Sequence, residues 1–231
     1  MILAGVETTS VTLIWTLSLL LNNKDVMNKT RAEVDTVVGK ERQVNESDLT
    51  NLVYLQAVLK ESMPLYPAGP LSVPRESITD CTVNGNHIPA GTQLFVNLHK
   101  IQRDPKVWDN PLDFQPERFL MTYKDYDVRG QNYDYLPFGG GRRMCPGISF
   151  ALRAIQFIVA NLAHGFEIST PSDEPVDMTQ AFKLSNLKVK PVEAILIRLS
   201  SSQPLLNIEE LELYFLILLF HQHQYLYKIS P

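Results

Sequence analysis

The segment 137–147, which reads PFGGGRRMCPG, contains the residue types in this chain that are best suited to chemistry. Cys145 comes directly before a predicted helix, where free backbone N–H groups and the positive end of the helix dipole would favour a thiolate. Three glycines let the backbone turn tightly and approach a flat ligand, and Arg143 can pair with an anionic group. These features suit a soft metal bound by one thiolate beside an acidic cofactor edge. A buried, inert cysteine after a flexible loop is the alternative.

Other functions of a glycine-rich loop fit this segment less well. A phosphate-binding loop requires Gly-Lys-Ser/Thr after its spacer, and a dinucleotide-binding loop requires a third glycine where Met144 stands. The chain has two cysteines and no CxxC pair, which excludes a disulfide framework and a cysteine-rich zinc module and favours a reduced, intracellular setting. Cys81 is interpreted as a packing residue of a hairpin strand. Isolated histidines interpreted as surface or core residues rather than metal ligands are His87, His99 and His164.

Hydrophobic periodicity predicts the helices that would position this loop. Residues 1–21 are apolar on most faces, which predicts a buried helix. A second helix should end at Gly39, which suits the position after a helix. Ser47 is the expected N-cap of a third helix, which Pro64 interrupts near its end. The helix after Cys145 is expected at about 147–164, with an apolar face made of Ile148, Leu152, Ile155, Val159 and Leu162.

The β structure that the sequence predicts is small. Asn84-Gly85 within residues 80–88 is a strong hairpin signal. Further strands are expected at 92–96 and 192–199. The long connection 105–145 is of a kind that is usually functional or disordered in a compact domain. The expected fold is therefore mainly α with a small β part.

Length and composition are those of a globular chain with a sizeable core, since 45% of the 231 residues are apolar and 20% are charged. The net charge is −4, from 21 basic and 25 acidic residues, which gives no case for a nucleic-acid binder. Residues 1–21 could span a bilayer by length, but they include Glu7 and lack the positive start of a signal peptide. A buried helix is therefore at least as good an interpretation. The apolar segment 214–220 is too short to span.

Several motifs, in consistent order, resemble those of one family. Residues 138–147 are similar to the haem-binding loop of the cytochrome P-450 haem-thiolate monooxygenases. Residues 4–9, AGVETT, resemble that family's oxygen-activating helix, Glu61 begins its Glu-x-x-Arg motif, and residues 114–119, FQPERF, match its Pro-Glu-Arg-Phe element. The resemblance covers residues 1 to about 199 and is closest to plant microsomal members. It implies that 1–199 form the C-terminal portion of the cytochrome P-450 fold.

The resemblance implies that Cys145 is the axial thiolate of the iron in haem b, a ligand that favours cleavage of the O–O bond. Phe138 would pack beside the sulfur, and two arginines would bind the haem propionates. The implied cofactor-binding residues are Phe138, Arg143, Arg75, Gly139 and Gly147.

The same resemblance gives roles to the first helix. Thr8 would hydrogen-bond dioxygen or a water at the iron, Glu7 would act as a proton relay, and Gly5 would let the helix open locally over the haem. A bond from the Thr8 hydroxyl to its own helix carbonyl is the alternative. Residues near 68–73 and 182–187 match segments that face the substrate in the family.

Three features depart from the family pattern. The arginine that should join Glu61 and Arg118 in a structural network is replaced by Pro64, so Glu61 is expected to be either protonated or unpaired. The chain begins inside the oxygen helix, so the N-terminal anchor and most of the substrate pocket are expected to be missing. Residues 200–231 form an off-pattern tail that we expect to lie outside the domain.

The function that the resemblance implies is insertion of one oxygen atom from O2 into a small, apolar, plant secondary-metabolite-like substrate. Electrons would come from NADPH through a reductase partner. The location would be the cytosolic face of the endoplasmic reticulum membrane, with membrane association only through an N-terminal anchor that this chain lacks. Two alternatives are a truncated, non-catalytic remnant of such an enzyme and a helical interaction module without haem.

Overall fold

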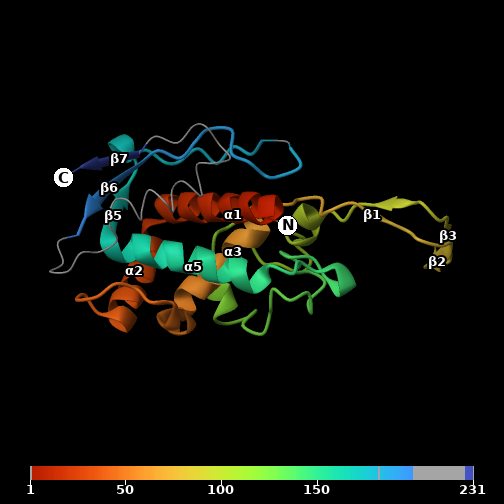
Figure 1. Ribbon diagram of the computed structural model, residues 1–231, viewed down its shortest axis with the longest axis horizontal. Helices are drawn as coiled ribbons and strands as arrows, with labels where there is room; N and C mark the ends of the chain where they lie inside the picture. The colour runs from red at the N-terminus through yellow and green to blue at the C-terminus, as the bar shows by residue number, and fades with distance from the viewer. Residues whose placement is uncertain (1, 182, 200–226, 231) are drawn as a thin grey trace.

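The computed structural model describes residues 2–181, 183–199 and 227–230. This part of the chain is mostly helical with three small sheets, which confirms a mainly α fold with a small β part (Figure 1). The α-helices are α1 (Ile2–Asn22), α2 (Lys24–Val38), α3 (Val53–Leu65), α4 (Leu98–Ile101) and α5 (Ile148–Gly165). Short 3-10 segments are η1 (Glu46–Asn51), η2 (Pro116–Phe119), η3 (Gly141–Arg143) and η4 (Pro171–Asp173).

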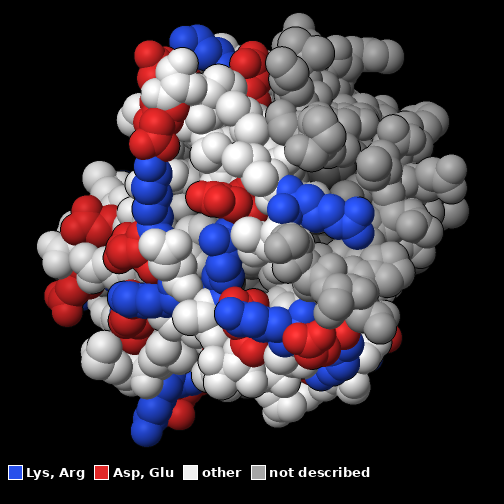
Figure 2. Space-filling model, turned by 90° about the vertical axis from the view of Figure 1, so that its left-hand side faces the viewer, with Lys and Arg blue, Asp and Glu red and all other residues white. Residues whose placement is uncertain are grey.

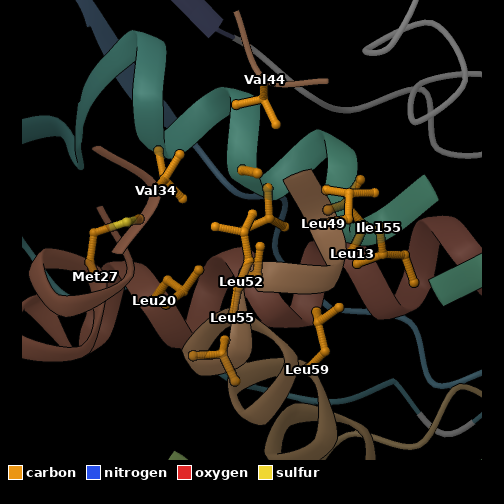
Figure 3. Packing of buried hydrophobic residues seen from close by; sticks show 14 of the residues in the cluster. Leu13, Leu20, Met27, Val34, Val44, Leu49, Leu52, Leu55, Leu59 and Ile155 are labelled. Carbon is orange, nitrogen blue, oxygen red and sulfur yellow. The ribbon is translucent and has the colours of Figure 1, made fainter. Parts of the chain in front are cut away.

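The four long helices pack around one apolar core. Helices α1 and α5 lie side by side and begin at the same end of the molecule, on the right in Figure 1, while α2 and α3 contact both. Figure 3 shows how side chains from all four helices meet in the core. Buried members of this core are Leu13, Leu20, Met27, Val34, Val44, Leu49, Leu52, Leu55, Leu59 and Ile155. Burial of such side chains, at about 25 cal/mol per Å² of apolar surface, is the main stabilising contribution.

Helix α5 agrees with the sequence pattern. It spans Ile148–Gly165, close to the expected 147–164. Ile155 and Val159 on its predicted apolar face are buried, and Leu152 is half-buried. The helix starts three residues after Cys145, so the core packing of α5 determines where that cysteine lies.

The start of α3 differs from the expectation that Ser47 is its N-cap. Asn45 and Asp48 cap the short η1 segment instead, with the Asn45 N–H donating to Asp48 Oδ2 at 2.8 Å. The first N–H groups of α3 are bound by Glu33 of α2, because Tyr54 N–H and Leu55 N–H donate to its two carboxylate oxygens at 2.6 and 2.9 Å. The cap thus comes from another helix, a contact that local sequence does not encode.

The C-terminal end of α5 is also held by α2. Arg31 donates to the carbonyls of Ala163 and Phe166 at 3.0 and 2.7 Å. The ring of buried His164 lies 2.9 Å from Asp35 through Nδ1 and 3.0 Å from the Arg42 carbonyl through Nε2. Cationic donors at the last carbonyls of a helix offset its unpaired acceptors and its dipole.

The strands are β1 (Arg75–Glu76), β2 (Cys81–Val83), β3 (Asn86–Ile88), β4 (Gln93–Leu94), β5 (Phe166–Ser169), β6 (Ala194–Arg198) and β7 (Tyr227–Ser230). Strands β2 and β3 form the predicted hairpin, and both turn residues have positive φ, 49° at Asn84 and 79° at Gly85. That pair of values is typical of the two-residue hairpin turn. Interpretation of Cys81 as a packing residue is wrong, since β2 is exposed along its length and Cys81 with it.

The remaining β structure is shorter than predicted. Strand β4 covers only part of 92–96 and pairs antiparallel with β1. Strand β6 lies within the predicted 192–199 and pairs antiparallel with β5. Most of the tail 200–231 lies outside the described residues, and the apolar segment 214–220 lies there as a whole. The strand that is described in it, β7, pairs parallel with β6.

Two helices are long and apolar enough to cross a membrane, Ala4–Asn22 and Ile148–Gly165. Half of each is buried inside the structure, as in the core helices of a soluble protein, so length and composition are weak grounds for a membrane span. The predicted burial of the first helix is confirmed for its second half, where Trp15 and Leu20 are buried.

Charged side chains of both signs are mixed on the end of the molecule that contains β5 and β6 (Figure 2). The described part of that face shows no field of one sign, in keeping with the near balance of 21 basic and 25 acidic residues.

The Glu33 cap gives a first prediction. Glu33→Ala removes both acceptors from the start of α3, and loss of a helix cap costs about 1–2 kcal/mol. We expect the free energy of unfolding to fall by that amount in urea denaturation. Asp173→Asn, which breaks only the exposed pair with Lys24, is the control and should change stability little. Equal effects of the two substitutions would contradict the capping role.

Candidate functional site

Cys145 lies in a loop that folds back on itself. Its backbone N–H donates to the Phe138 carbonyl at 3.0 Å. Gly139 and Gly141 have φ values of +71° and +69°, a left-handed conformation that strains other residues. The tight turn expected from the glycines is therefore present, and it places Cys145 just before the first turn of α5.

The thiol is half-buried at an uncapped helix start. Gly147 is the N-cap of α5, and it provides no side chain to bind the first N–H groups of the helix. A Cβ added to Gly147 would lie 3.8 Å from Cys145 Sγ, so the glycine leaves room beside the sulfur. The helix dipole and first-turn N–H groups favour negative charge at this place.

Two residues from distant segments lie against the loop. A Cβ on Gly130 would come within 2.9 Å of both Gly139 O and Gly140 Cα, so no larger residue fits there without moving the loop. On the other side, an Nη atom of Arg75 lies 3.8 Å from where a Cβ on Gly139 would be. Arg143, in η3, is exposed. Sequence reasoning missed Gly130, because a lone glycine in a long connection gives no sign of what packs on it.

A cluster of aromatic side chains supports the loop from inside. Phe138, Met144 and Cys145 pack against the apolar core that contains most of its rings, and the ring centroids of the cluster are 4.6 to 6.4 Å apart. We call it the aromatic cluster, and its members are Trp108, Phe119, Tyr123, Tyr126 and Tyr135. The density of aromatic residues between 108 and 138 is the sequence signal from which this cluster could be predicted. The cluster makes the long connection 105–145 a packed element rather than a loose loop.

The N-terminal end of α1 keeps one face open. A Cβ on Gly5 would meet nothing within 4 Å among the described residues. The Thr8 hydroxyl is exposed and donates to the Ala4 carbonyl of its own helix at 2.7 Å, which is the local alternative considered from the sequence. Glu7 is half-buried on the same part of α1. Because α1 and α5 begin at the same end of the molecule, Thr8 and Cys145 belong to the same end of the fold (Figure 1).

Further along, α1 is tied to α3 and to both predicted substrate segments. Trp15 stacks on Tyr66 with ring centroids 4.0 Å apart, and its Nε1 donates to the Asn186 carbonyl at 2.6 Å. The Asn186 N–H in turn donates to the Ala68 carbonyl at 3.0 Å. The segments near 68–73 and 182–187 are therefore brought together beside α1, while Phe182 itself lies outside the described residues.

Glu61 and Arg118 form a buried but poorly aligned ion pair. Arg118 Nε lies 3.2 Å from Glu61 Oε2 without hydrogen-bond alignment. The Arg118 guanidinium donates instead to the carbonyls of Asp109 and Asn110, at 2.6 and 3.0 Å. Glu61 Oε1 accepts from the Gln115 N–H at 3.1 Å. Arg118 thus keeps partners even though the sequence offers Pro64 in place of a second arginine.

Burial raises the pKa of Glu61 to about 8, and the nearby charge of Arg118 only partly opposes this shift. A carboxyl group in this position is mostly protonated at neutral pH. Of the two states expected for Glu61, protonated or unpaired, the structure favours the protonated one.

Pro64 lies inside α3, where the family pattern has arginine. Its carbonyl accepts from Arg103 Nε at 3.1 Å. Arg103 also contacts His99 and lies over the ring of Tyr66, 5.8 Å from its centroid. A guanidinium therefore reaches the end of α3, but from the segment just after α4 and onto the backbone rather than from position 64.

The side chains around Cys145 suit a metal ion whose other ligands are supplied by a cofactor. Within the described residues, no group of three or more His, Cys, Asp and Glu side chains could hold a metal ion by itself. A single cysteine at a helix start, glycines beside it and an arginine next to the loop fit a flat, acidic cofactor bound through one sulfur.

Comparison with known proteins identifies related chains. The family model described as Cytochrome P450 matches residues 1–196. Cytochrome P450 82A2 of Glycine max is 53% identical over 193 residues, which are 84% of this chain and 37% of that protein. Strychnine-10-hydroxylase of Strychnos nux-vomica is 50% identical over 196 residues, which are 85% of this chain and 37% of that protein. The chain thus spans about 37% of the length of these curated relatives.

Among solved structures, a zebra fish cytochrome P450 with abiraterone matches with a TM-score of 0.75 and 34% identity. The match covers 85% of this chain and 46% of that one. The expectation that the chain folds as a portion of the cytochrome P-450 fold is confirmed.

The raised pKa of Glu61 gives a second prediction. Between its ordinary value of 4.5 and about 8, the folded chain holds a proton that the unfolded chain has released. Stability should therefore fall as pH rises through this range, by at most about 1.4 kcal/mol per pH unit. Glu61→Gln should flatten that slope in urea denaturation at several pH values. Glu193→Gln, at an exposed position, is the control and should leave the slope unchanged. An unchanged slope in Glu61→Gln would mean that Glu61 is ionised in the folded chain.

Proposed function

The chain belongs to the cytochrome P450 family, and on that premise we propose that it is the haem-binding part of a haem-thiolate monooxygenase. The reaction is insertion of one oxygen atom from O2 into a small organic substrate. The observation that carries the proposal is the position of Cys145, half-buried at the uncapped start of α5 in a loop of glycines. The relative named for hydroxylating strychnine supports a plant secondary metabolite as the substrate class.

In this proposal, different residues around the loop bind different parts of the haem. Cys145 is the iron ligand, and Phe138 packs beside the sulfur. Arg75 and Arg143 pair with the propionates, in line with the position of Arg75 beside Gly139. When bound, a thiolate-ligated haem iron supplies activation of dioxygen and cleavage of the O–O bond.

Thr8 and Glu7 are the proton-handling residues in this proposal. The Thr8 hydroxyl now donates to the Ala4 carbonyl, and its oxygen keeps acceptor lone pairs for a water on the open face. The open space beside Gly5 leaves room for that water or for dioxygen. Glu7, one residue earlier, delivers protons toward the same face.

Electrons come from NADPH through a reductase, since thiolate-haem chemistry of this kind consumes two electrons for each oxygen atom inserted. Support for the reductase and for the endoplasmic reticulum membrane as the location comes from family membership alone.

A second candidate function follows from Pro64. In this candidate the chain folds but turns nothing over, because only one, poorly aligned, guanidinium lies at Glu61. The two candidates agree on the fold and differ in haem retention and turnover.

The assignment of Cys145 gives a third prediction. Cys145→Ser should abolish the thiolate–carbonyl Soret band of the chain supplied with haem, because serine cannot provide the sulfur ligand. Cys81→Ser should keep the band, because Cys81 lies on the exposed β2 strand. Loss of the band in the Cys81 variant alone would show that the ligand is assigned to the wrong cysteine. Absence of the band in the unchanged chain would favour an interaction module without haem.

Pro64 gives a fourth prediction. In chains that carry the complete N-terminal part of a relative, Pro64→Arg should raise the haem content per chain. Hydrogen bonds to charged groups contribute about 1.5–3 kcal/mol each, and an arginine at position 64 restores such donors near Glu61. The unchanged 231-residue chain should show no turnover with a reductase. Equal haem content and equal turnover with and without Pro64→Arg would show that Pro64 is tolerated.

A further inference from the structure

Pro64 removes a backbone hydrogen bond near the C-terminal end of α3. Proline has no N–H, so it cannot donate to the carbonyl of Lys60, four residues earlier in the helix. A buried carbonyl without a donor costs about 1–3 kcal/mol. The structure shows a substitute donor, because the Tyr135 hydroxyl donates to the Lys60 carbonyl oxygen at 2.9 Å.

Tyr135 is well suited to this task. It is fully buried, with 0% of its surface exposed. Burial raises the pKa of its hydroxyl well above the ordinary value, so the group keeps its proton and remains a donor. Its ring is fixed by the aromatic cluster, 5.2 Å from Phe119 and 6.0 Å from Trp108 between centroids. The hydroxyl therefore has a set position as well as a set protonation state.

We propose that Tyr135 is a positioning residue for Cys145, and that it acts by occupying the carbonyl that Pro64 leaves without a helix donor. The Tyr135 side chain joins α3 to the segment that leads into the cysteine loop. The tie exists because position 64 is proline. With an N–H at that position, the helix itself would supply the donor.

The tie continues from Tyr135 to the cysteine through neighbouring backbone groups. The N–H of Leu136 donates to Gln102 Oε1 at 2.9 Å, and Gln102 is itself buried. The Gly139 N–H donates to the Leu136 carbonyl at 3.0 Å. The Cys145 N–H donates to the Phe138 carbonyl at 3.0 Å. A shift of Tyr135 away from Lys60 would therefore loosen the same backbone that holds the thiol.

The proposal makes a prediction for Tyr135 that differs from the one for a residue with a packing role alone. If Tyr135 replaces the missing helix donor, loss of its hydroxyl should weaken the cysteine loop when position 64 is proline. The same loss should have little effect on the loop when position 64 has an N–H. A hydroxyl that serves general packing would matter equally in both cases. Coupling between neighbouring sites is what a double-mutant cycle measures.

The experiment compares Tyr135→Phe in the unchanged chain and in a Pro64→Ala background. Alanine restores the N–H without adding a charge. The readout is amide hydrogen exchange of Leu136, Gly139 and Cys145, measured without haem. We expect Tyr135→Phe to speed their exchange about fivefold in the Pro64 chain, the factor that corresponds to one lost hydrogen bond of about 1 kcal/mol. In the Pro64→Ala background the change should stay within about twofold, the range of independent sites.

Tyr123→Phe is the matched control. Tyr123 belongs to the aromatic cluster and also donates its hydroxyl to a backbone carbonyl, that of Val107, at 2.8 Å. Its acceptor is not in α3, so its loss should have the same effect on exchange in both backgrounds. The Gly39 N–H, bonded to the Asp35 carbonyl at 3.0 Å, reports on a segment outside the loop and should exchange at an unchanged rate.

Four results would overturn the proposal. Equal acceleration in both backgrounds would mean that Tyr135 does not stand in for the missing N–H. Acceleration of Gly39 together with the loop amides would mean a global loss of stability rather than positioning. Unchanged exchange of the loop amides in Tyr135→Phe would mean that the hydroxyl does not stabilise the cysteine loop. If Tyr135→Phe fails to fold, Pro64→Ala should rescue it, and failure of that rescue contradicts the proposal. The inference rests on the proposed function only in taking Cys145 as the haem ligand. Hydrogen exchange is measured without haem, so failure of the proposed function (no Soret band) and failure of this inference (no coupling between Tyr135 and position 64) are separate results.

Discussion

The burial of helix α3 is the constraint on which the rest of the structure depends. Its inner residues lie away from water, so each polar group they carry must find a partner inside the protein. The partners come from segments far apart in the chain, and they are Thr16, Glu33, Arg103, Arg118 and Tyr135. These hydrogen bonds and contacts hold α1, α2, the segment just after α4, η2 and the segment that leads to Cys145 in place around one helix.

The charge on α3 follows from the same constraint. Desolvation of Glu61 outweighs the attraction of a single guanidinium that is not aligned with it, so the carboxyl group holds its proton at neutral pH. The Arg118 guanidinium donates its hydrogen bonds to the backbone carbonyls of Asp109 and Asn110 instead. Protonation of Glu61 therefore weakens its attraction to the Arg118 guanidinium, so this contact adds little to the binding of the two segments.

The cysteine loop is held by packing and by backbone bonds rather than by regular secondary structure. The aromatic cluster lies on its inner side, and Gly130 allows a contact that no larger residue permits. On the other side of the loop, an Nη atom of Arg75 lies 3.8 Å from where a Cβ on Gly139 would be. Because Tyr135 belongs both to the cluster and to the tie with α3, the stability of the core and the geometry at Cys145 are linked through one side chain.

The sequence by itself determined the features that depend on near neighbours in the chain. The Asn84-Gly85 turn follows from the backbone freedom of two residues, and α5 follows from the spacing of its apolar side chains. Only the tertiary structure decided that Glu33 caps α3 and that Cys81 is exposed. It also decided that a hydroxyl from the cysteine segment replaces the N–H that proline lacks. The physical reason is that these features depend on contacts between residues that are far apart in the sequence. Local patterns of residue type do not specify which distant group contacts a given donor or acceptor.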